Sequence, residues 1–422
     1  MEATRIRLAE GVHLTYLPAR KFKTSLLSAQ FVTPLRRETA GANALLAAVL
    51  RRGTVSCPDM GALSAKMDNL YDASIDYTVR KKGENQCVGF VASFIDDRYA
   101  PGGERLLEPA AALLGELICD PVTYHGRFVP EYFESEKTNL LEAIRSLIND
   151  KRDWADSRLL RALCDGEAYA VPRLGDEETV DKLQALKVYT QYRDLISTAP
   201  LEIIYSGSAD LERVKQALAA AFATLPREEV RVISTAAPHV CRESVQHVED
   251  VLDVTQGKLG MGFSCGSDDM PALLMGNTLF GGSSNSKLFL NVREKLSLCY
   301  YASSLYHRQK GLITVSSGIE FQNYQRAYDE IMAQLEAVQE GELEDWELEG
   351  ARSTLLNSYA TVGDSQGKLE NFYLGQAATG QHETPADLAR AIQDMTAERI
   401  CRAMSTVKLD TVYFLKGKEA EA

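Results

Sequence analysis

The stretch Gly41-Ala-Asn-Ala-Leu-Leu-Ala-Ala-Val-Leu-Arg-Arg-Gly-Thr54 is an apolar, helix-like run that ends at a glycine. Within it, Ala44, Ala47 and Ala48 stand at positions i, i+3 and i+4, which share one face of a helix. Two histidines and a glutamate in this arrangement could hold a zinc ion and activate its bound water. Three methyl groups can do neither, so the sequence predicts a helix without metal-binding chemistry.

A second informative stretch is Phe280-Gly-Gly-Ser-Ser-Asn-Ser-Lys-Leu-Phe-Leu-Asn-Val-Arg-Glu-Lys-Leu-Ser-Leu-Cys-Tyr-Tyr-Ala-Ser-Ser304. It joins a glycine-rich turn to a helix start, then to Arg293 and to Tyr300 at the head of an alternating segment. A guanidinium can grip a carbonyl or carboxylate with paired hydrogen bonds, and a phenol can donate to a developing oxyanion. The turn lacks the Gly-Lys-Ser/Thr ending of a phosphate-binding loop, so we interpret it as a flexible connection.

Both stretches resemble the signatures of the insulinase, pitrilysin and mitochondrial-processing-peptidase family of zinc metallopeptidases. The first has the frame G-x-x-H-x-x-E-H-x-x-x-x-G-T, in which the two histidines fall on Ala44 and Ala48 and the glutamate on Ala47. The second matches the Arg/Tyr signature of the other half of these proteins. This resemblance implies that Arg293 and Tyr300 hold the substrate at a zinc site.

The family takes its last zinc ligand, a glutamate, from a later helix, which the segment Phe133–Ile144 resembles. Without a gap, the ligand position falls on Ala143, whereas a shift of one residue would restore a carboxylate at Glu142. A similar shift would replace Tyr300 by Tyr301. Acidic residues in such a segment otherwise form a solvated helix face. We therefore expect no metal ion in this chain, with all four ligand positions occupied by alanine.

Composition excludes several classes of function. The net charge of −13 and the pI near 5.1 argue against a nucleic-acid partner. Hydrophobic residues make up 45% and charged residues 25%, as in ordinary globular proteins, and no apolar run is long enough for a membrane span. The first residues lack the apolar core of a signal peptide, so the expected location is the cytoplasm. No two of the six histidines lie within four residues of each other: His13, His125, His239, His247, His307 and His382.

The two halves of the chain resemble each other in order. The alternating segment Ser25–Val32 precedes the first quoted helix, just as Lys258–Ser264 precedes a helix-like run at Pro271–Phe280. Later, Glu136–Leu141 is echoed by Ala351–Leu356. Strands and amphipathic helices in each half predict the α+β class. The resemblance implies two homologous α/β-sandwich-like domains, each a mixed or antiparallel sheet backed by helices, that form half of a clamshell.

The expected domain boundary follows from the end of the first half. A strand at Leu201–Tyr205 and a helix at Leu211–Leu225, with Asp210 as its N-cap, close that half. The polar segment after them has no helical period and is predicted to be a linker. We therefore expect an N-terminal domain without the zinc motif, a linker, and a C-terminal domain with the Arg/Tyr signature, at residues 1–226, 227–240 and 241–422.

The resemblance also implies a role. Members of the family pair to enclose a peptide chamber, and in some pairs only one subunit carries zinc. The prediction is therefore a non-catalytic subunit of a heterodimeric zinc peptidase, without activity alone, whose Arg293 and Tyr300 bind the peptide substrate. Zinc would lie in the homologous partner. The alternative is an inactive peptide-binding or scaffold protein with no part in proteolysis.

A more remote alternative rests on Gly262-Phe-Ser-Cys-Gly266, which matches the G-x-S-x-G pattern of serine hydrolases. It follows an alternating segment, and His307 and His382 lie downstream. However, the repeat explains the same residues as the end of a strand. Ser264 is therefore only a remote candidate for a nucleophile.

Overall fold

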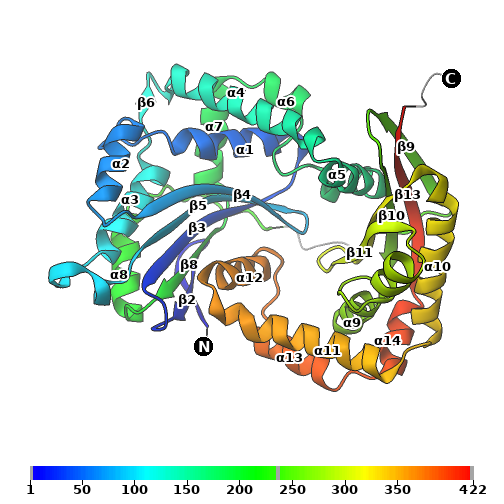
Figure 1. Ribbon diagram of the computed structural model, residues 1–422. Coiled ribbons are helices and arrows are strands. Elements are labelled where there is room, and N and C mark those ends of the chain that lie inside the picture. The colour runs from blue at the N-terminus through cyan, green and yellow to red at the C-terminus, as the bar shows by residue number, and fades with distance from the viewer. Residues whose placement is uncertain (1–2, 234–237, 419–422) are drawn as a thin grey trace. The chain divides into compact units, whose positions relative to one another are not determined.

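The computed structural model describes residues 3–233 and 238–418 (Figure 1). These residues form two compact units. The first contains residues 3–145, 171–233 and 363–382, and the second contains residues 146–170, 238–362 and 383–418. Each unit has its own β-sheet and its own hydrophobic core.

The first unit contains a six-stranded sheet with the strand order β1-β2-β8-β3-β5-β4. β2 and β8 run parallel, and the other neighbouring strands are antiparallel. β4 lies at one edge of this sheet. The bounds are Thr4–Ala9 (β1), Val12–Pro18 (β2), Thr24–Pro34 (β3), Ser74–Lys82 (β4), Asn85–Ile95 (β5) and Leu201–Gly207 (β8), with a short ribbon of Thr123–Tyr124 (β6) and Arg127–Phe128 (β7).

The second unit contains a five-stranded sheet with the order β11-β12-β10-β13-β9. Only β13 and β9 run parallel. The order and directions repeat those of β4, β5, β3, β8 and β2, which confirms the prediction of two homologous α+β halves. The bounds are Gln246–Leu252 (β9), Gly257–Cys265 (β10), Cys299–His307 (β11), Leu312–Ile319 (β12) and Val407–Gly417 (β13).

Helices cover both faces of the first sheet. Side chains that alternate along β3 point to opposite faces, so Leu27 and Phe31 enter the core below α1, α3, α7 and α8. Ser28 lies on the other face, where its hydroxyl donates to Glu370 of α12 at 2.7 Å. The bounds are Arg37–Leu50 (α1), Met60–Asp68 (α2), Leu107–Cys119 (α3), Pro130–Ser146 (α4), Glu177–Asp181 (α6), Ala185–Thr198 (α7), Leu211–Ala221 (α8) and Gln366–Ala378 (α12).

The second sheet is covered in the same way. Phe263 of β10 packs edge-on against Phe280 of α9 in the core. The opposite face of β10 receives α5, and Gly262 allows this approach, because a Cβ there would lie 2.7 Å from Cδ2 of Leu163. The bounds are Lys151–Leu163 (α5), Met270–Phe280 (α9), Tyr324–Glu340 (α10), Asp345–Ala360 (α11), Pro385–Gln393 (α13) and Ala397–Met404 (α14).

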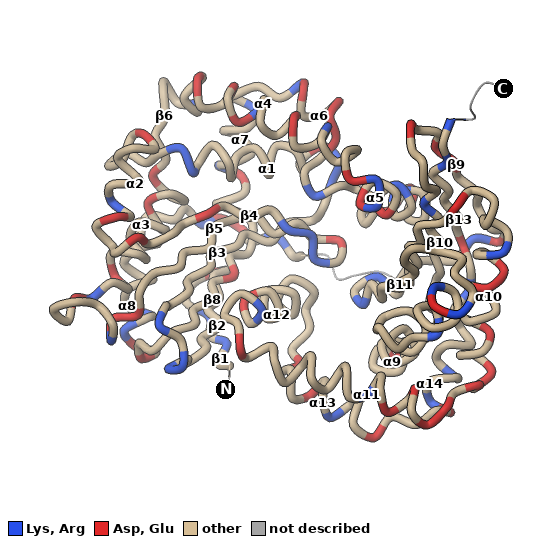
Figure 2. The backbone as a smooth tube through the Cα atoms, in the orientation of Figure 1, with Lys and Arg blue, Asp and Glu red and all other residues tan. Residues whose placement is uncertain are grey.

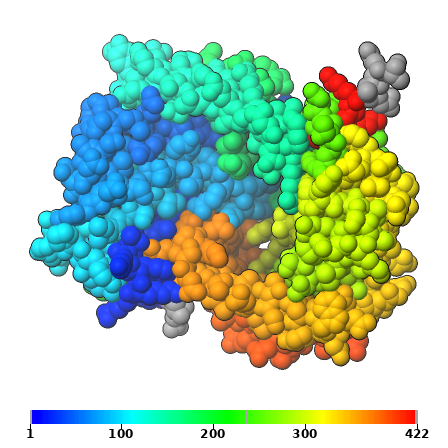
Figure 3. All heavy atoms as spheres, viewed as in Figure 1, coloured from blue at the N-terminus to red at the C-terminus, as the bar shows by residue number. Residues whose placement is uncertain are grey.

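One helix from each half of the chain belongs to the unit that is formed mainly by the other half. α5 lies in the first half of the chain but packs on β10 and β13, whereas α12 lies in the second half but packs on β3 and β8. In Figure 3 the orange atoms of the α12 segment lie against the blue atoms of the first unit. The predicted boundaries at 226 and 240 follow the repeats and do not include this exchange. Residues 234–237 of the predicted linker lie outside the described residues.

The structure also bears on two smaller expectations, the helix that closes the first half and the absence of a membrane span. The helix predicted at Leu211–Leu225 ends at Ala221, and Asp210 is its N-cap, accepting a hydrogen bond from the main-chain N–H of Arg213. Within residues 3–233 and 238–418, every helix is too short or too polar to cross a lipid bilayer.

Candidate functional site

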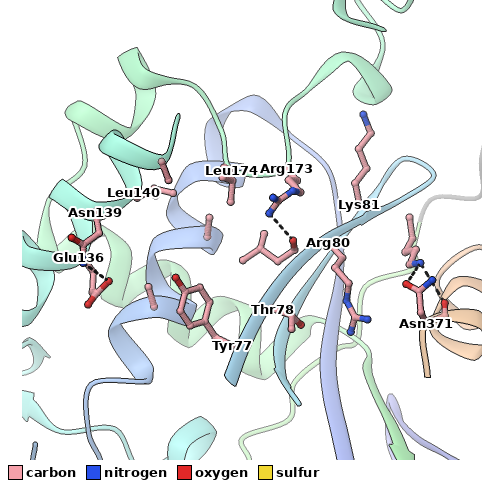
Figure 4. Close-up of a pocket in the computed structure, with 15 residues that line it drawn as sticks. Tyr77, Thr78, Arg80, Lys81, Glu136, Asn139, Leu140, Arg173, Leu174 and Asn371 are labelled. Carbon is pink, nitrogen blue, oxygen red and sulfur yellow. Dashed lines mark hydrogen bonds between the residues drawn. The ribbon is translucent and has the colours of Figure 1, made fainter. Parts of the chain in front are cut away.

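A cavity of about 730 Å³ opens beside α1 in the first unit. Ala44 and Ala48 of α1 and Ala143 of α4 all line it. Residues of β4, among them Thr78 and Arg80, form another part of its wall (Figure 4). The three positions that the family resemblance assigned to metal ligands on two separate helices therefore meet around one space. In this chain each of them presents a methyl group to that space.

The fourth position, Ala47, is fully buried in the core and does not line the cavity. Glu142, the residue that a shift of one position would select, is exposed and is not part of the cavity wall. Ala143 is therefore the residue of α4 that faces the cavity at this level. Methyl groups offer no donor atom to a metal ion, so these residues do not fit a zinc site.

One acidic residue remains in the wall of the cavity. Glu136 accepts a hydrogen bond from Nη1 of Arg52 and another from Nδ2 of Asn139, each at 3.1 Å. The guanidinium of Arg52 lies over the ring of Tyr132, 5.1 Å from its centre. The negative charge of Glu136 is thus balanced by Arg52. Figure 4 shows Glu136 and Asn139 side by side.

The opposite wall of the cavity is the edge strand β4, and two arginines donate hydrogen bonds to its main-chain carbonyls. Nε of Arg51 donates to the carbonyl of Ile75 at 2.5 Å, and Nη1 of Arg173 donates to the carbonyl of Val79 at 3.1 Å. These carbonyls point away from β5, and in an antiparallel pair every second residue does so. The main chain of Tyr77, midway between them, therefore also faces outward. Figure 4 shows the Arg173 side chain directed at this strand.

In the second unit, Arg293 and Tyr300 line one cavity of about 440 Å³. The Arg293 guanidinium lies 4.7 Å from the ring centre of Phe289 and pairs with Glu294 at 3.3 Å. The Tyr300 side chain is exposed, and its hydroxyl donates to Glu320 at 2.5 Å. This hydrogen bond to a carboxylate raises the pKa of Tyr300, because the phenol is stabilised in its protonated form.

The backbone around these two residues is irregular. Arg293 lies in a π-helical segment, Leu288–Lys295, and Ser297 has a positive φ of 50°. A bulge between Cys299 and Tyr301 then interrupts the pairing of β11 with β12. As a result Tyr300 faces the cavity, whereas Tyr301 lies under the guanidinium of Arg152 at 4.3 Å. The two neighbouring tyrosines therefore have different surroundings.

One group of side chains that could hold a metal ion occurs in the described part of the chain. Cys164, Glu167 and His239 bring ligand atoms within 4.8 Å of one another. However, Nδ1 of His239 lies 2.5 Å from Glu167 and its Nε2 lies 3.2 Å from the buried Asp410. The ammonium of Lys310, also buried, pairs with Glu167. A lysine thus supplies the positive charge that a metal ion would bring, so the group is an ionic network.

The serine hydrolase alternative is wrong. Ser264 lies inside β10, is 5% exposed, and is paired with Leu312 on one side and Lys408 on the other. A nucleophile elbow needs a sharp turn at the serine that leads directly into a helix, whereas α9 begins only at Met270. His307 is held by the hydroxyls of Tyr169 and Thr314, so it serves the structure of the sheet.

Comparisons with known proteins place the chain in a family. The family described as the peptidase M16 inactive domain matches residues 182–355. The chain is 34% identical to the "probable inactive metalloprotease YmfF" of Bacillus subtilis over 416 residues, which cover 97% of this chain and 96% of that protein. The chain belongs to the peptidase M16 family, as an inactive member. This confirms the resemblance to the insulinase-like zinc metallopeptidases.

Further proteins resemble this chain in sequence or in fold. An uncharacterized zinc protease of Streptomyces coelicolor is 25% identical over 79% of this chain and 75% of its own length. The crystal structure of a conserved protein from Enterococcus faecalis has a TM-score of 0.90 at 26% identity, with all of both chains covered. A peptidase M16 inactive domain from Pseudomonas fluorescens has a TM-score of 0.80 at 17% identity, again over both whole chains.

Proposed function

We propose that this chain is the non-catalytic subunit of a heterodimeric zinc peptidase, and that it contributes Arg293 and Tyr300 to substrate binding. One contrast supports the proposal. The zinc-helix positions Ala44 and Ala48 carry no ligands, while Arg293 and Tyr300 still share one cavity. A subunit that acts only through a partner would lose its own metal ligands and keep its substrate-binding groups.

The contacts of the two residues suit such a role. The Arg293 guanidinium lies over the ring of Phe289. Its edge, which carries five N–H donors, is therefore the part that can reach a carbonyl or carboxylate. The Tyr300 hydroxyl already donates to a carboxylate, Glu320. A peptide carbonyl that becomes an oxyanion would compete for the same donor. Zinc would be supplied by the homologous partner, and the cytoplasm remains the predicted location.

The test is the activity of a purified complex of this chain with its zinc-bearing partner. Removal of one oxyanion donor lowers kcat by about 100-fold or more in other peptidases, so Tyr300→Phe should cause a loss of that order. Arg293→Ala should mainly raise KM. Tyr124→Phe, which removes an exposed hydroxyl from the first unit, is the matched control. Unchanged activity in both Arg293→Ala and Tyr300→Phe would remove the substrate-binding role.

A second candidate is an inactive peptide-binding or scaffold protein without a role in proteolysis. The cavity beside α1 favours it, because that cavity lies along an edge strand whose Tyr77 main chain faces outward. An extended peptide can add to such an edge through main-chain hydrogen bonds. The two candidates differ in their partners: only the first requires a companion chain with an intact zinc motif.

A further inference from the structure

We propose that the cavity beside α1 recognises a peptide through an acidic side chain, which binds Arg173 and releases it from the carbonyl of Val79. The inference rests on the second candidate, the peptide-binding protein, because that candidate uses the cavity beside α1. It names the chemical class of the ligand as a peptide that carries a carboxylate.

The first observation is the charge of the cavity wall. Four of its residues are basic and one is acidic, although the whole chain carries a net charge of −13. Figure 2 shows the basic run at the end of β4, which comprises Arg80, Lys81 and Lys82. The single acidic residue, Glu136, is already paired with Arg52. A positively charged recess in an acidic protein attracts anionic groups.

The second observation is how these cations are bonded. Arg80 is neutralised by a two-pronged pair with Glu370, at 2.6 and 2.7 Å. Lys82 instead donates to the neutral Asn371, at 2.7 Å to its side-chain oxygen. Among the described residues, the only acceptor bound by the Arg173 guanidinium is the Val79 carbonyl at 3.1 Å. The charge of Arg173 is therefore not matched by a carboxylate.

The third observation is where Arg173 binds. The Val79 carbonyl is one of the outward-facing acceptors of the edge strand β4, so it is a group that an added peptide strand would use. Arg51 occupies the equivalent acceptor at Ile75. A peptide that binds along β4 must therefore replace the Arg173 hydrogen bond at Val79.

An acidic side chain makes this replacement favourable. A guanidinium binds a carboxylate through two charge-assisted hydrogen bonds, which are stronger than one bond to a neutral carbonyl. When Arg173 turns to the carboxylate of the ligand, the Val79 carbonyl becomes available to an N–H of the same peptide. A neutral or basic peptide gains no such compensation, so Arg173 would exclude it from the edge of β4.

The experiment exposes immobilised full-length protein to a degenerate library of short peptides with amidated C-termini, and identifies the retained peptides by mass spectrometry. Asp and Glu should be enriched about tenfold over Asn and Gln at one position. Arg173→Gln should abolish this enrichment. Lys82→Gln should lower it by roughly threefold, because it removes a neighbouring charge without touching the Val79 hydrogen bond. Arg193→Gln, an equal charge change at an exposed position of α7, should leave it unchanged.

The outcomes separate the inference from the function on which it rests. If no peptide of any composition is retained, peptide binding at the cavity beside α1 fails, and the second candidate function fails with it. If peptides are retained without an acidic preference, or the preference persists in folded Arg173→Gln and Lys82→Gln proteins, the acidic recognition fails and peptide binding stands. An acidic preference that depends on Arg173 and survives Arg193→Gln supports the inference.

Discussion

Glu370→Gln should weaken the attachment of α12 to the sheet of the first unit. Glu370 is 3% exposed and accepts two hydrogen bonds from the guanidinium of Arg80 and one, at 2.7 Å, from Ser28. Glutamine keeps the shape but loses the charge, so Arg80, whose side chain is only 22% exposed, is left without its counter-ion. Breaking a buried ion pair by changing one partner costs about 3–5 kcal/mol. Because Arg80 keeps some contact with water, we expect about 3 kcal/mol.

Native-state amide exchange measures this cost where it arises. Both tryptophans of the chain lie in the second unit, so their fluorescence would not report on α12. A loss of about 3 kcal/mol corresponds to roughly 100-fold faster exchange of the protected amides of α12. Asp364→Asn is the matched control. Asp364 lies two residues before α12 and pairs with Lys21, and both of these side chains are exposed. Because an exposed ion pair adds little to stability, that change should leave the exchange rates of α12 close to those of the wild type.

A double-mutant cycle measures the coupling between Arg80 and Glu370. Arg80→Met combined with Glu370→Gln removes the unpaired charge, so the double variant should recover part of the loss, with a coupling energy of about 2 kcal/mol. Equal exchange rates in Glu370→Gln and Asp364→Asn would refute the reasoning. They would mean that the ion pair does not hold α12 on the sheet.

Three further predictions follow from other parts of the fold. Gly262→Val places a side chain against α5 and should destabilise the second unit by about 1–3 kcal/mol, seen as a lower urea midpoint of tryptophan fluorescence. Burial alone would raise the pKa of Glu202. However, His13 on β2, whose Nδ1 lies 3.4 Å from the carboxylate, and Arg5 on β1, which donates two hydrogen bonds to it, hold this pKa below its ordinary value. Its stabilising effect is therefore present above the unfolded-state pKa of about 4.3 and lost as the pH falls through the folded-state value; the gap in stability between wild type and Glu202→Gln should shrink on acidification, and a constant gap would contradict this. The triple variant Ala44→His, Ala48→His and Ala143→Glu should bind about one zinc ion per chain by elemental analysis, because all three positions face one cavity; a zinc content equal to wild type would show that they do not converge.

The repeat of the two halves and the positions of several strands could be predicted from the sequence. Alternation in Ser25–Val32 and Lys258–Ser264 identified β3 and β10, because side-chain period is a local property of the chain. The convergence of Ala44, Ala48 and Ala143 on one cavity agrees with the family frame. That frame carries information about contacts between distant helices that periodicity alone does not.

The exchange of α5 and α12 could not be predicted in this way. An amphipathic pattern shows that a helix buries one face, but not which sheet it covers. One signal was present: Gly260 and Gly262 alternate along β10, which is typical of a strand that another element approaches closely. Arg173 gave no signal, because it lies in a connection before α6 and its role depends on a main-chain carbonyl of a distant strand.

The most direct test of the central claim is affinity purification of the tagged full-length protein from its native cells, with mass spectrometry of the proteins that accompany it. If the chain is the non-catalytic half of a split peptidase, a homologous chain with an intact zinc motif should be recovered in a ratio of about one to one. Recovery of this chain alone, or only with unrelated proteins, would contradict that role.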